Sequence, residues 1–147
     1  MVQVEEDSED INYDMLAVTS GNHTDSWILD TGASFHMTSN RDWFETYKAG
    51  NMGSVQLADD KVCGVVGSGQ MKFRMHDGII RTLADVRHVP AMKKNLISLG
   101  TLHRNGFRYK ADEDDDVLKV RKGAMVVMKG QKTSRSVYRL IGSVVVG

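Results

Sequence analysis

The run WILDTGAS, residues 27–34, decides how this chain folds. Its first three residues are large and apolar, which is typical of a short buried β-strand. The strand ends at Asp30, whose carboxylate is costly to bury unless the fold supplies hydrogen bonds. Gly32 lets the backbone approach that carboxylate closely, and Thr31 offers a hydroxyl one step away. We therefore expect a carboxylate whose pKa is adjusted by its surroundings.

The run resembles the active-site loop of aspartic proteases of the pepsin and retroviral type. The longer run WILDTGASFHM, residues 27–37, is more specifically similar to the protease segment of copia-type retrotransposon polyproteins. This resemblance extends to about residue 140. It implies an all-β, retropepsin-like closed β-sheet fold with one short C-terminal helix, assembled as a homodimer. It also implies that Asp30 is catalytic, and that Thr31 and Gly32 belong to the active-site loop and help to hold the two copies of the dimer together.

Length and composition fit one domain with a hydrophobic core. The chain has 147 residues, 41% of them hydrophobic, and its 19 basic and 19 acidic side chains give zero formal net charge. Direct nucleic-acid binding is therefore not expected, and no apolar run is long enough to cross a membrane. The single cysteine, Cys63, excludes an intrachain disulfide and favours a reducing compartment. With the resemblance, this predicts a cytoplasmic location in the context of a virus-like particle.

The chain divides into three parts. Residues 1–24 read as an acidic, flexible leader, in which residues 11–18 can still pair as an edge strand. Residues 25–110 correspond to the retropepsin-like protease domain. Residues 111–147 are a C-terminal β extension, which in copia-like polyproteins leads toward the pre-integrase junction.

Local patterns predict a meander of strands with two helices. Residues 38–40 supply N-cap candidates for a short helix at residues 41–47. The main helix is expected over residues 96–105, with Leu96, Leu99 and Leu102 on one face and Gly106 at the C′ position. The resemblance aligns residues 96–98 with the second family signature, so that a serine stands where retroviral proteases carry glycine. The expected strands are residues 55–57, 62–66, 71–75, 79–89, 107–110, 117–121, 124–129 and 137–141, with hairpin turns at 76–78 and 122–123.

The resemblance also implies a glycine-bearing hairpin that covers the cleft as a flap. We place it within residues 57–69, with its tip either at residues 59–61 or in the glycine cluster that follows. Substrate contacts are expected from Ala33 and Ser34 after the catalytic turn, and from Val65 and Val66 on the flap. The expected flap residues are Leu57, Asp59, Asp60, Lys61, Gly64, Gly67 and Gly69.

Peptide hydrolysis by this chemistry requires two adjacent carboxylates, which share one proton because like charges at that range cannot both ionise. The ionised carboxylate takes a proton from water and the protonated one donates to the carbonyl oxygen, so neither a metal nor another cofactor is needed. The sequence contains one Asp-Thr-Gly. We therefore expect a homodimer in which each copy supplies Asp30, and an extended peptide as substrate.

Other residues leave alternatives open. His36 either tunes the dyad, contacts substrate or is a hydrogen-bonded structural residue, and we favour the last. The remaining histidines and Cys63 lack metal-ligand spacing, so a zinc site is not expected. The predicted function is an aspartic endopeptidase that processes its own retrotransposon polyprotein. The alternative is a catalytically silent protease-like module for dimerisation or peptide binding.

Overall fold

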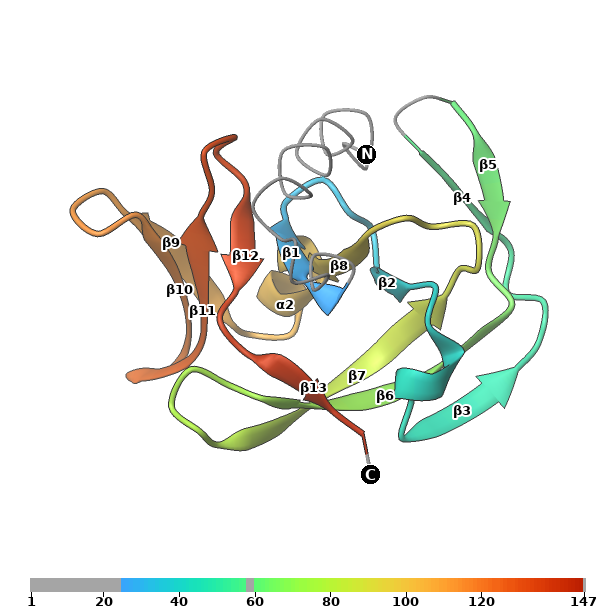
Figure 1. The fold of residues 1–147 in the computed structure, drawn as a ribbon, viewed down its shortest axis with the longest axis horizontal. Helices are drawn as coiled ribbons and strands as arrows, with labels where there is room; N and C mark the ends of the chain where they lie inside the picture. The colour runs from blue at the N-terminus through green and yellow to red at the C-terminus, as the bar shows by residue number, and fades with distance from the viewer. Residues whose placement is uncertain (1–24, 58–59, 147) are drawn as a thin grey trace.

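The computed structural model describes residues 25–57 and 60–146 (Figure 1). The leader, the expected edge strand at residues 11–18 and Asp59 lie outside these residues. In the described part of the chain, strands predominate and there is one short α-helix, so the all-β class is confirmed. The elements are β1 (Trp27–Asp30), β2 (His36–Thr38), the 3-10 helix η2 (Arg41–Trp43), β3 (Thr46–Ala49), β4 (Ser54–Gln56), β5 (Val62–Gly64), β6 (Gly67–Arg74), β7 (Ile80–His88), β8 (Asn95–Ser98), α2 (Leu99–Arg104), β9 (Arg108–Asp112), β10 (Val117–Lys122), β11 (Met125–Lys132), β12 (Tyr138–Leu140) and β13 (Ser143–Val145).

One large sheet carries most of these strands, in the order β13-β6-β7-β2-β8-β1-β12-β11-β10-β9, with β3 paired to β6. β4 and β5 form a separate two-stranded sheet. The pairs β1·β8 and β2·β7 are parallel, which the expected meander did not include. β1, the strand that ends at Asp30, therefore lies between β8 on one edge and β12 on the other.

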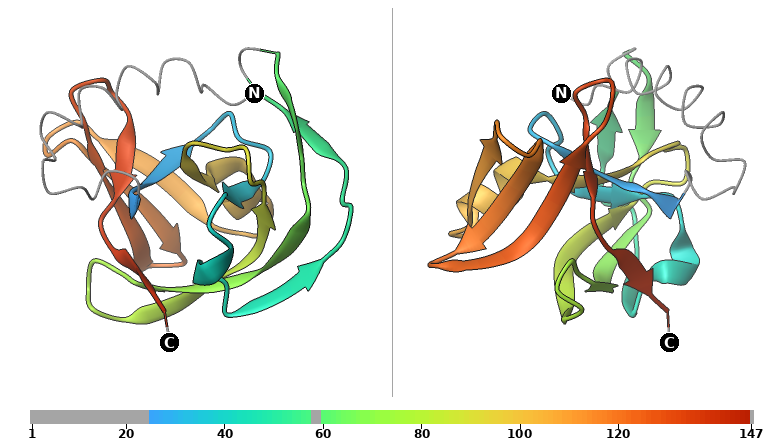
Figure 2. Two further views of the ribbon diagram at one scale, coloured as in Figure 1. Left: turned by 45° about the vertical axis from the view of Figure 1, so that its right-hand side comes forward. Right: turned by 60° about the vertical axis from the view of Figure 1, so that its left-hand side comes forward.

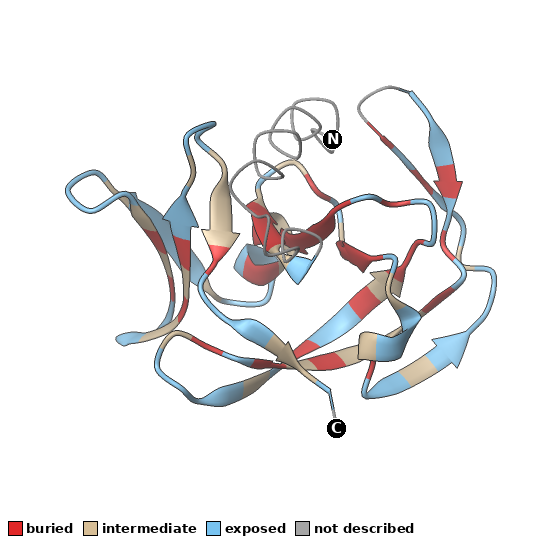
Figure 3. Cartoon of the chain, in the orientation of Figure 1, coloured by how far each residue is buried: buried red, intermediate tan, exposed pale blue. Residues whose placement is uncertain are grey.

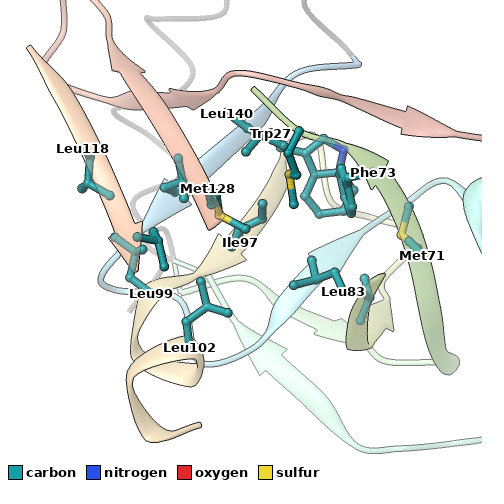
Figure 4. Close-up of a cluster of buried hydrophobic side chains, with 14 of the residues drawn as sticks. Trp27, Met71, Phe73, Leu83, Ile97, Leu99, Leu102, Leu118, Met128 and Leu140 are labelled. Atoms are coloured by element: carbon teal, nitrogen blue, oxygen red, sulfur yellow. The ribbon is translucent and has the colours of Figure 1, made fainter. Parts of the chain in front are cut away.

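The side chains of β1 alternate between two hydrophobic clusters, as the twofold period of a strand requires. Trp27 and Leu29 belong to the larger cluster, and Ile28 belongs to the smaller one. In the larger cluster the Trp27 ring meets Phe73 edge-on, with 5.1 Å between ring centroids (Figure 4). Because both faces of β1 are covered, its sequence reads as an unbroken apolar run. The buried residues accordingly concentrate at the centre of the molecule (Figure 3).

The helix expected at residues 41–47 is wrong beyond its first turn. Asn40 caps η2, because its side chain accepts a hydrogen bond from the backbone N–H of Asp42. The helix ends at Trp43, and β3 then pairs with β6 in antiparallel register. Tertiary pairing outweighs the local helical pattern here.

The main helix is likewise shorter than expected. Leu96 lies in β8, not on the helix, and its parallel pairing with Ile28 explains why it is fully buried. Ser98 is the N-cap, since its side chain accepts a hydrogen bond from the backbone N–H of Thr101. The expected end is confirmed, because Gly106 has a φ of +95° just beyond the last turn.

The glycine cluster does not form a hairpin tip. Gly67 and Gly69 lie in β6, which pairs with β3 on one edge and β7 on the other. A Cβ at Gly69 would collide with the backbone carbonyl of Thr46, and one at Gly67 would collide with the ring of Tyr47. The glycines are therefore required by the close approach of β3 to β6.

The strands after residue 111 continue the same sheet. The expected strands and the 122–123 turn are present as β10, β11 and β12, and β12 pairs directly with β1. β13 was not predicted, and it returns to pair with β6. The C-terminal extension thus completes the sheet around the strand that carries Asp30 (Figure 2).

Candidate active site

Asp30 stands at the end of β1, where the strand gives way to a tight turn. The backbone N–H of Gly32 donates to Oδ1 of Asp30 at 2.7 Å. Burial raises the pKa of the Asp30 carboxyl, and the Gly32 hydrogen bond opposes that rise only in part. The carboxyl therefore holds its proton to higher pH than a solvated aspartate, which suits a group that must donate as well as accept protons.

Ser98 connects three elements around this turn. It lies opposite Asp30 in the parallel β1·β8 register. Its hydroxyl donates to the carbonyl oxygen of Ala33 at 2.8 Å and accepts from the N–H of Thr101 at 3.0 Å. Its own N–H donates to Nδ1 of His36 at 2.9 Å. This fully buried serine therefore holds the turn after β1, β2 and α2 in one network.

His36 is part of that network and is held neutral. Its pKa is lowered to about 4, chiefly by burial; the negative charge of Asp85 opposes this shift and the positive charge of Arg104 adds to it. Nδ1 must be unprotonated to accept from Ser98, so the ring proton resides on Nε2. His36 is thus a buried, hydrogen-bonded residue of the fold, as the favoured interpretation had it.

The other residues of the turn differ in exposure. Thr31 and Ser34 are exposed, and Gly32 is half-buried. Within residues 25–57 and 60–146, the Thr31 hydroxyl makes no hydrogen bond. Ala33 is buried in the smaller cluster, with its carbonyl bound to Ser98. Thr31 and Ser34 are therefore the residues of the turn that a second molecule can reach directly.

The hairpin formed by β4 and β5 is the element that corresponds to the expected flap. Its connection runs through Leu57, whose N–H donates to the carbonyl of Lys61 at 2.8 Å, and Asp60, which has a φ of +66°. Of the two alternatives for the tip, the segment at residues 59–61 lies in this connection, whereas the glycine cluster does not. Gly64, in β5, is exposed.

The inner side of this hairpin packs toward the turn that follows β1. Leu57 and Val65 are buried in the same cluster as Ala33. Val66, in contrast, is 41% exposed. Figures 1 and 2 show the hairpin rising on the same end of the molecule as the loop that follows β1.

A second loop also reaches Asp30, and no sequence pattern indicates it. A pocket of about 380 Å³ is bordered by Asp30 and Thr31 together with residues 135–138 of the β11–β12 connection. Its lining also includes the apolar residues Leu99 and Leu118. In the described chain, Asp30 is the one acidic residue on its border. Residues 137–141 read as a strand from their sequence, but no local pattern indicates that the segment before them lies beside residue 30.

The described residues hold no cluster of three or more potential ligands (His, Cys, Asp or Glu) arranged for a metal ion. In the same part of the chain, neither helix has the length and apolar content that a bilayer crossing demands.

Comparison with known proteins adds the family. A family model described as "Pol polyprotein, beta-barrel domain" matches residues 27–107, more than half of the chain. The chain belongs to this family. The matched region of the Pol β-barrel domain begins at the first residue of β1 and ends after α2, so it contains Asp30, the β4–β5 hairpin and Ser98.

A curated relative supports the same assignment. The chain is 37% identical over 105 residues, 71% of its length, to "Retrovirus-related Pol polyprotein from transposon TNT 1-94" of Nicotiana tabacum. It spans 8% of the length of that relative. No solved structure matches the chain. The Pol β-barrel domain is thus related to one short segment of a long retrotransposon polyprotein.

Proposed function

We propose that this Pol β-barrel domain is the aspartic endopeptidase of its polyprotein, with a retropepsin-like fold and a catalytic centre formed by Asp30 from two copies. The observation that carries the proposal is the state of that carboxyl. It ends a strand buried on both faces, accepts a hydrogen bond from Gly32, and has a raised pKa at the border of a pocket. Family membership supports the polyprotein context.

The requirement for two copies follows from the chemistry. One carboxylate must activate water while its neighbour donates a proton to the scissile carbonyl oxygen. The pocket at Asp30 has no second acidic residue among the described ones. A twofold axis beside the turn supplies the missing carboxylate, and the exposed Thr31 is available to contact its counterpart. The dyad then titrates as a pair, so neither of its macroscopic pKa values belongs to one residue.

Substrate binding in this proposal uses the main chain of an extended peptide. The peptide lies between the active-site turn and the β4–β5 hairpin, which acts as the flap, and it is bound as an added strand. The exposed Ser34 and Val66 are placed to contact it, while Ala33 and Val65 contribute through the backbone and through packing. The expected setting is the cytoplasm, within a virus-like particle.

The deciding experiment compares wild type with Asp30→Asn on a peptide that spans the upstream junction of the chain. Asp42→Asn is the matched control, because Asp42 is an exposed aspartate on η2. We expect cleavage by wild type and by Asp42→Asn, and none by Asp30→Asn. Specific activity should fall on dilution, as the dimer separates.

The oligomeric state must be measured on the same samples, by sedimentation. If a confirmed dimer of the wild type cleaves nothing at acidic or neutral pH, the endopeptidase is refuted. The catalytically silent module for dimerisation or peptide binding then takes its place.

A further inference from the structure

The β11–β12 connection, residues 133–137, lies beyond the region that matches the family model, yet it borders Asp30. Two strand pairings anchor it there. β12 pairs with β1 in antiparallel register, with Leu29 opposite Tyr138, so the residues just before Tyr138 run alongside Asp30 and Thr31. β11 continues the sheet on the far side of β12. The position of the connection beside the carboxylate is therefore fixed by the sheet.

The connection itself is tightly built. The N–H of Thr133 donates to the carbonyl of Val137 at 2.7 Å, and the Thr133 hydroxyl accepts from the N–H groups of Arg135 and Val137, each at 3.3 Å. Ser136 has a φ of +63°, which is rare for a residue with a side chain. Strained, closed loops of this kind persist where the surrounding structure determines them, and they concentrate at binding sites.

This loop presents two apolar or aromatic residues and two polar ones to the pocket. Val137 is half-buried and packs against the smaller hydrophobic cluster, and Tyr138 is also half-buried. Leu118 and Leu99 also line the pocket. Arg135 and Ser136 are exposed at the outer border. A peptide residue whose apolar side chain occupied this pocket would have its main chain close to the Asp30 carboxyl.

We propose that residues 135–138 form a specificity wall of the active site, which accepts an apolar side chain of the substrate next to the scissile bond. Val137 determines the size of that side chain. The inference rests on the proposed endopeptidase function, and it adds a subsite supplied by the C-terminal hairpin. It also makes this hairpin part of the catalytic unit.

The test uses two junction peptides that differ in one residue beside the cleaved bond, alanine in one and phenylalanine in the other. The measured quantity is the ratio of their kcat/KM values for wild type, Val137→Ala and the control Ser134→Ala. Ser134 is exposed in the same connection but does not border the pocket. Val137→Ala enlarges the pocket, so it should raise kcat/KM for the phenylalanine peptide relative to the alanine peptide by about tenfold, the usual size of such discrimination. Ser134→Ala should leave the ratio unchanged.

A second readout separates this inference from the proposed function. Binding of the two peptides, fluorescently labelled, is measured on Asp30→Asn with and without Val137→Ala. If the wild type does not cleave but the ratio of dissociation constants shifts with Val137→Ala, the endopeptidase fails and the subsite stands. If Val137→Ala changes both peptides by the same factor, or only weakens dimerisation, the specificity wall is refuted.

Discussion

Replacing Ser98 by alanine tests whether one buried hydroxyl holds the active-site turn to the helix that follows β8. The substitution leaves the backbone N–H free to donate to His36, but it removes the two hydrogen bonds of the hydroxyl. Loss of the N-cap hydrogen bond, which the N–H of Thr101 donates to the Ser98 hydroxyl, costs about 1 kcal/mol. The carbonyl of Ala33, now buried without this donor, costs about 1–3 kcal/mol more. We therefore expect the free energy of unfolding to fall by about 2–4 kcal/mol in total.

Urea denaturation followed by circular dichroism measures this loss from the midpoint and slope of the transition. Ser34→Ala is the matched control, because this serine lies in the same turn but its side chain is exposed. Its effect should stay within about 0.5 kcal/mol. If Ser98→Ala lowered the free energy of unfolding no more than the control does, the Ser98 hydrogen bonds would not be what holds the turn in place.

Three further predictions concern stability. The pKa of His36 is lowered to about 4 from an ordinary value near 6.5, so its stabilising contribution is complete above pH 6.5 and is lost as the pH falls toward 4. The loss amounts to about 3 kcal/mol, and urea titrations between pH 7 and 4 should show a shallower decline for His36→Gln. The raised pKa of Asp30 has the opposite effect on stability, because the buried carboxyl becomes charged, and the fold less stable, as the pH rises. Asp30→Asn should therefore be at least as stable as wild type at pH 7. A clear loss of stability in this variant would contradict the burial argument. Gly69→Ala should lower the free energy of unfolding by about 2 kcal/mol or more, because the new Cβ would collide with the carbonyl of Thr46. Gly64→Ala is the control, because a Cβ there has no neighbour within 4 Å. In thermal melts this control should be neutral or slightly stabilising.

The sequence predicted the features that depend on short-range pattern. The apolar run before Asp30, the turn at residues 76–78 and the strands at residues 71–75 and 79–89 are all present. The carboxylate and its Gly32 donor were also predictable, because a strand followed by Asp-Thr-Gly brings them together locally.

The misassigned elements are those in which tertiary pairing overrides local preference. Residues 95–98 follow a helical spacing of leucines, but their burial on both faces against β1 makes them a strand. An N-cap serine three residues before Thr101 was a signal that the helix begins at Leu99. Gly67 and Gly69 looked like turn residues, and only the position of β3 shows that they permit close contact between strands.

The loop beside Asp30 was beyond the reach of local reasoning. Nothing in residues 133–137 indicates that they border a carboxylate more than a hundred positions earlier in the chain. That neighbourhood arises because β12 pairs with β1, and the register of such a long-range pair depends on the whole sheet.

The position of β1 between β8 and β12 also affects when the site can form. Both partners of this early strand are synthesised later, and β12 comes nearly at the end of the described chain. Long-range pairings of this kind fold slowly, because the entropy of closing a long loop is lost before the contacts that compensate for it are made. On the ribosome, a nascent chain that has not yet reached Leu140 leaves one edge of β1 open. The surroundings of the Asp30 carboxylate are therefore complete only after the chain has been translated as far as β12.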